Sequence, residues 1–227
     1  MMPGAIMIFA AGRGTRMGDL TATRPKPLIP VAGRPLIDHA LRLTDGKGLC
    51  LVVNLHYLGG QIRRHLANRD IHFSDESARL LETGGGLRHA LPLLGGDPVF
   101  TLNSDAVWHG PNPLDALARA WDPARMDALL MLVPPERAAG HPGAGDFTIG
   151  ADGLLERGPG LIYSGAQIVR TDRLAEIEEA AFSLNRLWDL LAADDRLYGL
   201  PYDGRWCDVG HPDGLALAER MLEGADV

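Results

Sequence analysis

Short apolar runs alternate with segments of helical spacing along the first half of the chain. Residues 5–11 are continuously apolar, which is typical of a parallel strand buried on both faces. Similar patterns predict strands at 49–55, 71–73 and 98–102, and helices at 35–43, 60–68 and 84–94. Strands and helices that alternate at this spacing indicate an α/β fold, with a doubly wound, mostly parallel, Rossmann-like mixed sheet and helices on both of its faces.

The pattern changes after about residue 125 without an intervening linker or repeat. Strands are predicted at 128–133, 161–169 and 197–201, and helices at 174–181, 184–193 and 212–222. Residues 150–153, Gly-Ala-Asp-Gly, predict a hairpin turn between two short strands within 146–157. We therefore expect a single domain over residues 1–227, in which residues 126–227 frame a site built by residues 1–125.

Composition narrows the class of protein. The net charge of −7 argues against nonspecific nucleic-acid binding, which needs a basic surface. No apolar run reaches the roughly 18 residues that span a bilayer, and residues 1–9 lack the features of a signal peptide. Cys50 and Cys207 lie far apart and have no metal-binding spacing, so we expect no disulfide. These features predict a cytoplasmic protein with no membrane partner.

Two neighbouring segments carry candidate chemistry for binding phosphate. The first strand runs into a glycine-rich turn at 12–18, and such turns can direct backbone N–H groups at phosphate. The turn lacks the Gly-Lys-Ser/Thr ending of a P-loop, and Met17 stands where a dinucleotide-binding fingerprint needs Gly or Ala. Lys26, one of only two lysines, lies between prolines that we expect to hold it on extended backbone.

These segments resemble the signature of sugar-1-phosphate nucleotidyltransferases. The resemblance begins with residues 10–17 (AAGRGTRM) and 24–28 (RPKPL). It continues in the expected order through residues 82–86 (ETGGG), 103–105 (NSD), 145–147 (GDF), 163–165 (YSG) and 206–210 (WCDVG). It implies the nucleotidyltransferase fold, with residues 1–125 binding nucleotide and 126–227 binding sugar. It also implies Mg²⁺-dependent transfer of a nucleotidyl group to a sugar 1-phosphate, with release of pyrophosphate.

Within this family, the short length and the ETGGG and GDF segments favour uridylyl transfer from UTP to N-acetylmuramate 1-phosphate, a reaction of cell-wall recycling. Guanylyl transfer from GTP to mannose 1-phosphate is the main alternative, and cytidylyl transfer to a phosphorylated alcohol is another. A non-catalytic nucleotide-sugar sensor is an alternative of a different class. Base identity and the choice between monomer and homodimer stay open.

The resemblance also assigns roles to individual residues. Lys26 and Arg16 are expected to be the catalytic cations, and Asp105 and Asp208 to hold Mg²⁺, since two carboxylates that leave room for water suit this ion. The expected nucleotide-binding residues are Ala11, Gly12, Arg13, Gly14, Glu82, Gly85, Gly86 and Asn103. The expected sugar-binding residues are Asp146, Ser164 and Gly165, although Asp146 could equally begin a strand.

One segment departs from the family pattern. Many relatives carry a second lysine, in a Glu-Lys-Pro segment, that contacts the sugar phosphate, whereas this chain has Glu156-Arg157-Gly158. Arginine is not an automatic substitute for lysine. Either Arg157 takes the place of that lysine or the sugar phosphate is held in another way.

Overall fold

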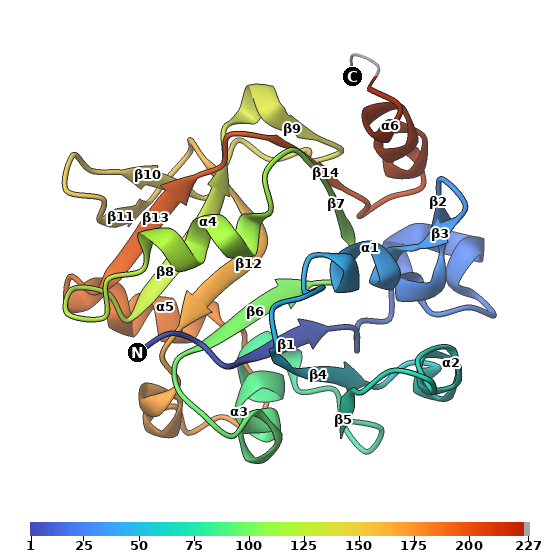
Figure 1. Ribbon diagram of the computed structural model, residues 1–227, viewed down its shortest axis with the longest axis horizontal. Helices are drawn as coiled ribbons and strands as arrows, with labels where there is room; N and C mark the ends of the chain where they lie inside the picture. The colour runs from blue at the N-terminus through green and yellow to red at the C-terminus, as the bar shows by residue number, and fades with distance from the viewer. Residues whose placement is uncertain (225–227) are drawn as a thin grey trace.

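A seven-stranded sheet forms the centre of the computed structural model, which describes residues 1–224 (Figure 1). The spatial order is β13-β8-β12-β6-β1-β4-β5. These strands are β1 (Ala5–Phe9), β4 (Cys50–Leu55), β5 (His72–Asp75), β6 (Val99–Asn103), β8 (Ala128–Val133), β12 (Ile162–Val169) and β13 (Leu197–Pro201). Only β12 is antiparallel to its neighbours in this sheet. The predicted mostly parallel mixed sheet is confirmed.

Helices cover both faces of this sheet. On one face α1 (Leu36–Arg42), α2 (Gly59–His65) and α4 (Pro113–Ala120) pack in a cluster with Ile6 and Ile8 of β1. On the other face α3 (Glu82–Leu94) and α5 (Asn185–Ala193) pack with Ala5 and Met7. Successive side chains of a strand point to opposite faces, so two covered faces require the continuous apolar run of β1.

A second, three-stranded sheet continues from the carboxyl end of β6. It consists of β7 (Ala106–His109), β14 (Arg205–Asp208) and β9 (Ala138–Ala139), in the order β7-β14-β9. The last helix, α6 (Asp213–Leu222), packs against β14, β7 and the short strand β2 (Pro30–Val31), which pairs with β3 (Arg34–Pro35). Through this sheet, residues after 200 reach the end of a strand from the first half.

The predicted hairpin within 146–157 is confirmed as β10 (Phe147–Ile149) and β11 (Leu155–Arg157), which pair antiparallel. The predicted helix at 174–181 is wrong, because the chain forms only a short 3₁₀ helix, η4 (Asp172–Glu176). The Arg88 guanidinium donates hydrogen bonds to the carbonyl groups of residues 174, 177 and 179. A side-chain cation therefore satisfies carbonyls that a longer helix would have paired internally.

The backbone around Lys26 also differs from expectation. Pro25 is extended, but Lys26–Leu28 form a 3₁₀ turn, η2, in which Leu28 N–H donates to the Pro25 carbonyl. Pro27 is tolerated because the first residues of a helical turn need no N–H donor. The other 3₁₀ helices are η1 (Thr15–Thr21) and η3 (Pro135–Arg137). Within the described residues, no helix is long and apolar enough to cross a membrane.

Candidate active site

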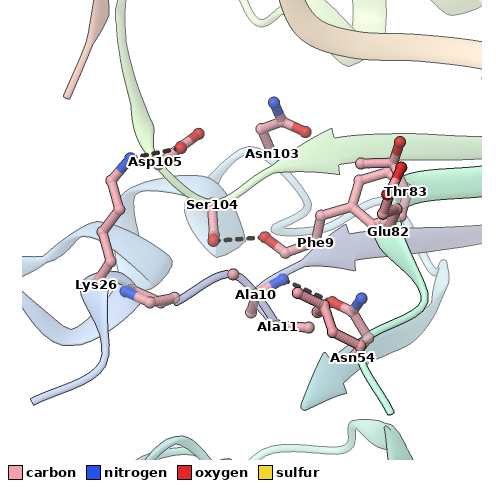
Figure 2. Close-up of a pocket in the computed structure, with 13 residues that line it drawn as sticks. Phe9, Ala10, Ala11, Lys26, Asn54, Glu82, Thr83, Asn103, Ser104 and Asp105 are labelled. Atoms are coloured by element: carbon pink, nitrogen blue, oxygen red, sulfur yellow. Dashed lines mark hydrogen bonds and ion pairs between the residues drawn. The ribbon is translucent and has the colours of Figure 1, made fainter. Parts of the chain in front are cut away.

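Lys26 and Asp105 meet at the carboxyl ends of two neighbouring parallel strands (Figure 2). Lys26 follows β1 through the glycine-rich turn, and Asp105 lies two residues after β6. The Lys26 Nζ atom lies 2.6 Å from Asp105 Oδ2, and Lys26 is only 7% exposed. Doubly wound sheets bind ligands at this edge. The structure therefore directs the ammonium group of Lys26 at the predicted site.

Asp208 reaches the same place from the other end of the chain. In the antiparallel pair β14–β7, Asp208 lies opposite Ala106, and the Val209 N–H donates to the Asp105 carbonyl at 2.9 Å. Burial raises the pKa of the Asp208 carboxyl, and the Asp105 carboxylate raises it further, while Lys26 and other nearby cations oppose the shift. Two crowded carboxylates of this kind favour a bound cation.

A divalent hard cation fits this pair of oxygen donors. Among the described residues there is no group of three or more His, Cys, Asp or Glu side chains that could hold a metal ion. Mg²⁺ commonly binds proteins through one or two carboxylates and takes its other ligands from substrate phosphates and water. Asp105 and Asp208 are two carboxylates of this kind, and their role in holding Mg²⁺ stays a prediction.

The glycine-rich turn packs directly on Lys26. Gly14 has a positive φ of 65°, and a methyl group added to it would lie 2.9 Å from Lys26 Cβ. Glycine is therefore needed here for backbone conformation and for close approach to the lysine. Arg16 extends toward His211, where its Nη1 lies 3.4 Å from the ring Nε2, and its charge acts on Asp208. The Arg13 residue is exposed.

A cavity of about 230 Å³ opens beside Lys26 and Asp105. Its walls come from the loop after β1, the ends of β4 and β6, and the first residues of α3 (Figure 2). The predicted residues that line it are Ala11, Gly12, Lys26, Glu82, Asn103 and Asp105. Sequence reasoning missed Asn54, Thr83 and Ser104. Of these, Ser104 was signalled by its place between Asn103 and Asp105.

A network of buried hydrogen bonds lies next to the cavity and connects the segments that line it. Asn54 Oδ1 accepts the Ala10 N–H at 2.7 Å, and Asn54 Nδ2 donates to Glu76 Oε1 at 2.7 Å. The second carboxylate oxygen of Glu76 accepts the Leu81 N–H at 3.1 Å, and Glu76 is 2% exposed. The network joins the start of the glycine-rich turn to the start of α3. No local sequence pattern indicated Glu76.

The predicted role of Gly85 and Gly86 at the nucleobase needs correction. Both lie in the first turns of α3 and face protein, and neither lines the cavity. A methyl group on Gly85 would lie 2.5 Å from the Ala180 carbonyl oxygen, and one on Gly86 would lie 2.6 Å from Glu76 Oε1. These glycines let α3 pack closely against Ala180 and Glu76. This close packing is sufficient to explain why glycines occur in a row here.

A second cavity, also of about 230 Å³, shares Thr83 and Asn103 with the first. Its other lining residues are Asp146, Phe147, Arg157, Tyr163, Ser183, Leu184, Asn185 and Trp188. Asp146, which was predicted to bind sugar, lines this cavity, and its Oδ2 accepts the Tyr163 N–H at 2.8 Å. The aromatic rings of Tyr163 and Trp188 meet edge-on at 4.7 Å.

Ser164 and Gly165, both predicted to bind sugar, do not line this cavity. The Ser164 hydroxyl donates to the Met131 carbonyl at 2.7 Å, and the residue is 1% exposed. The pairing of β12 is irregular between Tyr163 and Gln167, which disturbs the alternation of side chains along the strand. Gly165 has φ 87°, and a methyl group there would lie 2.7 Å from the Asn103 side chain. Its bare Cα makes room for Asn103.

Comparisons with known proteins show the family of this chain. A family model described as a MobA-like NTP transferase domain matches residues 6–197. The N-acetylmuramate alpha-1-phosphate uridylyltransferase of Caulobacter vibrioides is 43% identical, with 97% of each chain covered. The protein of the same name from Neisseria meningitidis is 38% identical, covering 90% of this chain and 92% of its own.

The fold is also that of a solved structure. HddC from Yersinia pseudotuberculosis complexed with GMP-PN matches with a TM-score of 0.76, covering 98% of this chain and 100% of that one, at 19% identity. The resemblance predicted from the N-terminal motifs is therefore confirmed by a family model over most of the chain and by nearly full-length relatives. The chain belongs to the MobA-like NTP transferase family and is a nucleotidyltransferase.

Proposed function

We propose that this enzyme transfers a uridylyl group from UTP to N-acetylmuramate 1-phosphate, giving the UDP-sugar and pyrophosphate. The ion pair of Lys26 and Asp105 in the lining of the first cavity, with Asp208 close enough to interact electrostatically with both, carries the proposal of phosphoryl chemistry. The substrates are those named for the relatives from Caulobacter and Neisseria, whose similarity spans nearly the whole chain. We further propose that it works in the cytoplasm, as a monomer or homodimer.

The reaction is an in-line displacement at phosphorus. A phosphate oxygen of the sugar 1-phosphate forms a bond to the α-phosphorus of UTP. The bond between that phosphorus and the oxygen bridging it to the β-phosphate breaks, and pyrophosphate leaves with this oxygen. The nucleophile is already ionised at neutral pH, so no general base is needed. The barrier is the repulsion between two polyanions, and positioning together with fixed cations lowers it.

Lys26 supplies the fixed cation. The contact with Gly14 and the 3₁₀ turn hold its stem, and the ion pair with Asp105 holds its ammonium group. A buried, positioned charge costs little reorganisation when negative charge develops on the transferring phosphoryl group. Arg16, near Asp208 and His211, is placed to bind the pyrophosphate portion with its planar fork.

Mg²⁺ would bind Asp105 and Asp208. When bound, it neutralises charge on phosphate oxygens and so favours the encounter of the two substrates. The backbone from Ala11 to Gly14 is placed to contact the triphosphate. Glu82 and Asn103 line the cavity proposed for the nucleoside, and Asp146 lines the one proposed for the sugar.

The test is a pyrophosphate-release screen of four nucleoside triphosphates against a panel of sugar 1-phosphates with Mg²⁺. We expect turnover with UTP and N-acetylmuramate 1-phosphate. Turnover with GTP and mannose 1-phosphate, but not with UTP, would overturn the substrate assignment and retain the class. Tight nucleotide-sugar binding without turnover of any pair would favour a sensor.

The lysine assignment has a matched control within the chain. Lys26→Ala is expected to lower kcat by about 10²–10³-fold, the typical cost of losing one charge-stabilising group. Lys47, the other lysine, pairs with Asp115 and lines neither of the two cavities. Lys47→Ala should retain wild-type kcat, and equal losses in both variants would contradict the assignment.

A further inference from the structure

The second cavity contains one basic side chain among its described lining residues, and that residue is Arg157. The only acidic side chain in the lining, Asp146, already has one oxygen engaged by the Tyr163 N–H. In a chain of net charge −7, a cation placed in a substrate cavity indicates a ligand with a negative group there. Arg157 is thus the feature of this cavity that most restricts the chemistry of its ligand.

Three neighbours hold the guanidinium of Arg157 in place. Its Nη1 donates to Asn185 Oδ1 and its Nη2 to Asp189 Oδ1, each at 2.9 Å. The group also lies over the ring of Phe147, at 4.9 Å from the ring centre. A longer bond also runs from Nη2 to the Asn185 carbonyl at 3.4 Å, so of the five N–H donors of arginine one on Nη1 and the one on Nε remain for a ligand. The planar group is fixed before any ligand arrives, which lowers the entropic cost of binding.

The ion pair with Asp189 does not saturate this cation. The side chains of Arg157 and Asp189 are 44% and 60% exposed, so water screens their attraction. Exposed ion pairs of this kind contribute little to stability, so a ligand can replace one partner at little cost. A ligand carboxylate that reaches the guanidinium from the cavity side can displace Asp189 and bind through charge-assisted N–H···O bonds, which are stronger than neutral ones.

The location of Arg157 separates it from the phosphate end of the site. Lys26 and Asp105 line the first cavity, which Arg157 does not line, and only Thr83 and Asn103 line both. A sugar whose phosphate lies near Lys26 and Asp105 would direct its ring, past Asn103, into the second cavity. Arg157 then faces a substituent of the sugar ring.

We propose that Arg157 binds the lactyl carboxylate of the sugar and so selects N-acetylmuramate 1-phosphate over N-acetylglucosamine 1-phosphate. The two sugars differ only by the lactyl ether, which adds one carboxylate. This inference rests on the proposed function, because it presumes that N-acetylmuramate is the sugar. It makes Arg157 a determinant of specificity and leaves the binding of the phosphate to the first cavity.

The test compares kcat/KM for the two sugar 1-phosphates, with saturating UTP, in the wild-type enzyme and Arg157→Gln. We expect Arg157→Gln to lower kcat/KM for N-acetylmuramate 1-phosphate by about 10- to 100-fold, the value of one charge-assisted contact. The value for N-acetylglucosamine 1-phosphate should change by less than about twofold. Arg157→Lys should recover part of the lost preference for N-acetylmuramate 1-phosphate, since lysine keeps the positive charge but lacks the planar guanidinium.

Binding of the products gives a second readout that needs no turnover. Calorimetric titration with UDP-N-acetylmuramate and UDP-N-acetylglucosamine should show weaker binding of the former alone in Arg157→Gln. Arg186→Gln is the matched control, because Arg186 lies on α5 beside Asn185, pairs with Glu179 and does not line the second cavity. It should leave both affinities unchanged.

The outcomes separate this inference from the proposed function. A wild-type enzyme that does not use N-acetylmuramate 1-phosphate would refute the proposed function. A wild-type enzyme that uses it, with Arg157→Gln losing activity equally on both sugars, would show that Arg157 holds the shared phosphate or the fold, and would overturn the inference. Unchanged product affinities in Arg157→Gln would overturn it as well.

Discussion

Gly14 and Lys26 form one structural unit at the level of single residues. The turn before Lys26 needs a positive φ at Gly14, and the lysine stem occupies the space that a side chain at this glycine would fill. A phosphate-binding role alone would require only an open approach to the backbone. The structure adds a second requirement, because the glycine determines where the ammonium group can lie.

Gly14→Ala and Gly18→Ala test this coupling. Gly14 has the left-handed conformation, so its substitution should lower the free energy of unfolding by about 1–2 kcal/mol, and that of Gly18, whose ψ is −132°, by at least as much. Only Gly14 approaches Lys26, whereas a methyl group on Gly18 meets no atom within 4 Å. Gly14→Ala should therefore also lower kcat/KM by about 10- to 100-fold, as a misplaced catalytic group does. Equal kinetic losses in both variants, with stability measured by urea unfolding, would rule out the coupling.

At the level of elements, Glu76 joins three parts of the first half of the chain. It follows β5, accepts a hydrogen bond from Asn54 at the end of β4, and accepts the N–H of Leu81 just before α3. Asn54 in turn holds the Ala10 N–H after β1. A buried carboxylate surrounded by donors sets the relative positions of the elements that line the first cavity.

Glu76→Gln should destabilise the enzyme by about 2 kcal/mol, because its NH₂ group would face a donor where an oxygen is needed. The KM for the nucleoside triphosphate should rise, since Ala10 and Leu81 flank that cavity. Glu178→Gln makes the same chemical change at an exposed residue and should stay within about 0.5 kcal/mol of wild type. Thermal unfolding that gave equal midpoints for the two variants would refute the role of Glu76.

His39 makes the packing of α1 sensitive to pH. Burial lowers the pKa of His39 below its ordinary value of 6.5, and the nearby charges of Arg34 and Arg42 lower it further, against a hydrogen bond with the Val31 carbonyl. The folded protein therefore binds fewer protons at this site than the unfolded chain just below that value. Stability that is present above pH 6.5 is lost as the pH falls toward the folded-state pKa.

His39→Gln should flatten this part of the stability profile. Between about pH 7 and about pH 5.5, the wild-type free energy of unfolding should decrease more than that of the variant. Urea titrations at several pH values would measure both profiles. Parallel profiles would mean that His39 does not contribute to the acid sensitivity.

At the level of the whole molecule, the sheet draws strands from both halves of the chain. Strand β12, from the second half, pairs with β6 of the first half, and β8 and β13 follow it. Asp208 reaches Asp105 only through the pairing of β14 with β7. The site is therefore built across the two halves.

This arrangement predicts one cooperative unfolding transition for residues 1–227. A fragment of residues 1–125 would expose the unpaired edge of β6 and the apolar face that the second half covers, so we expect it not to fold alone. Scanning calorimetry should give equal calorimetric and van't Hoff enthalpies for the full chain. Two separate transitions, or a folded fragment, would contradict a single domain.

Local pattern predicted both bounds of two strands, the fully buried β8 and the partly buried edge strand β13. Strands β8 and β13 begin and end where the apolar runs do. The helix α4 was missed although Asn112 caps it and Pro113 occupies its first position, which are regular start signals. The helix expected at 174–181 was wrong: the segment forms only a short 3₁₀ helix, and Arg88, distant in sequence, donates to its carbonyl groups.

The sequence by itself determined the family, the alternation of strands and helices, and the motif residues at strand ends, because each depends on short stretches of neighbouring residues. Tertiary structure alone decided which of these residues share a cavity. It left Ser164, Gly165, Gly85 and Gly86 out of the lining of both cavities, placed Glu76 in the hydrogen-bond network behind the first, and placed Arg157 in the lining of the second. The physical reason is that such placements follow from strand pairing and packing between distant segments, which no local pattern encodes.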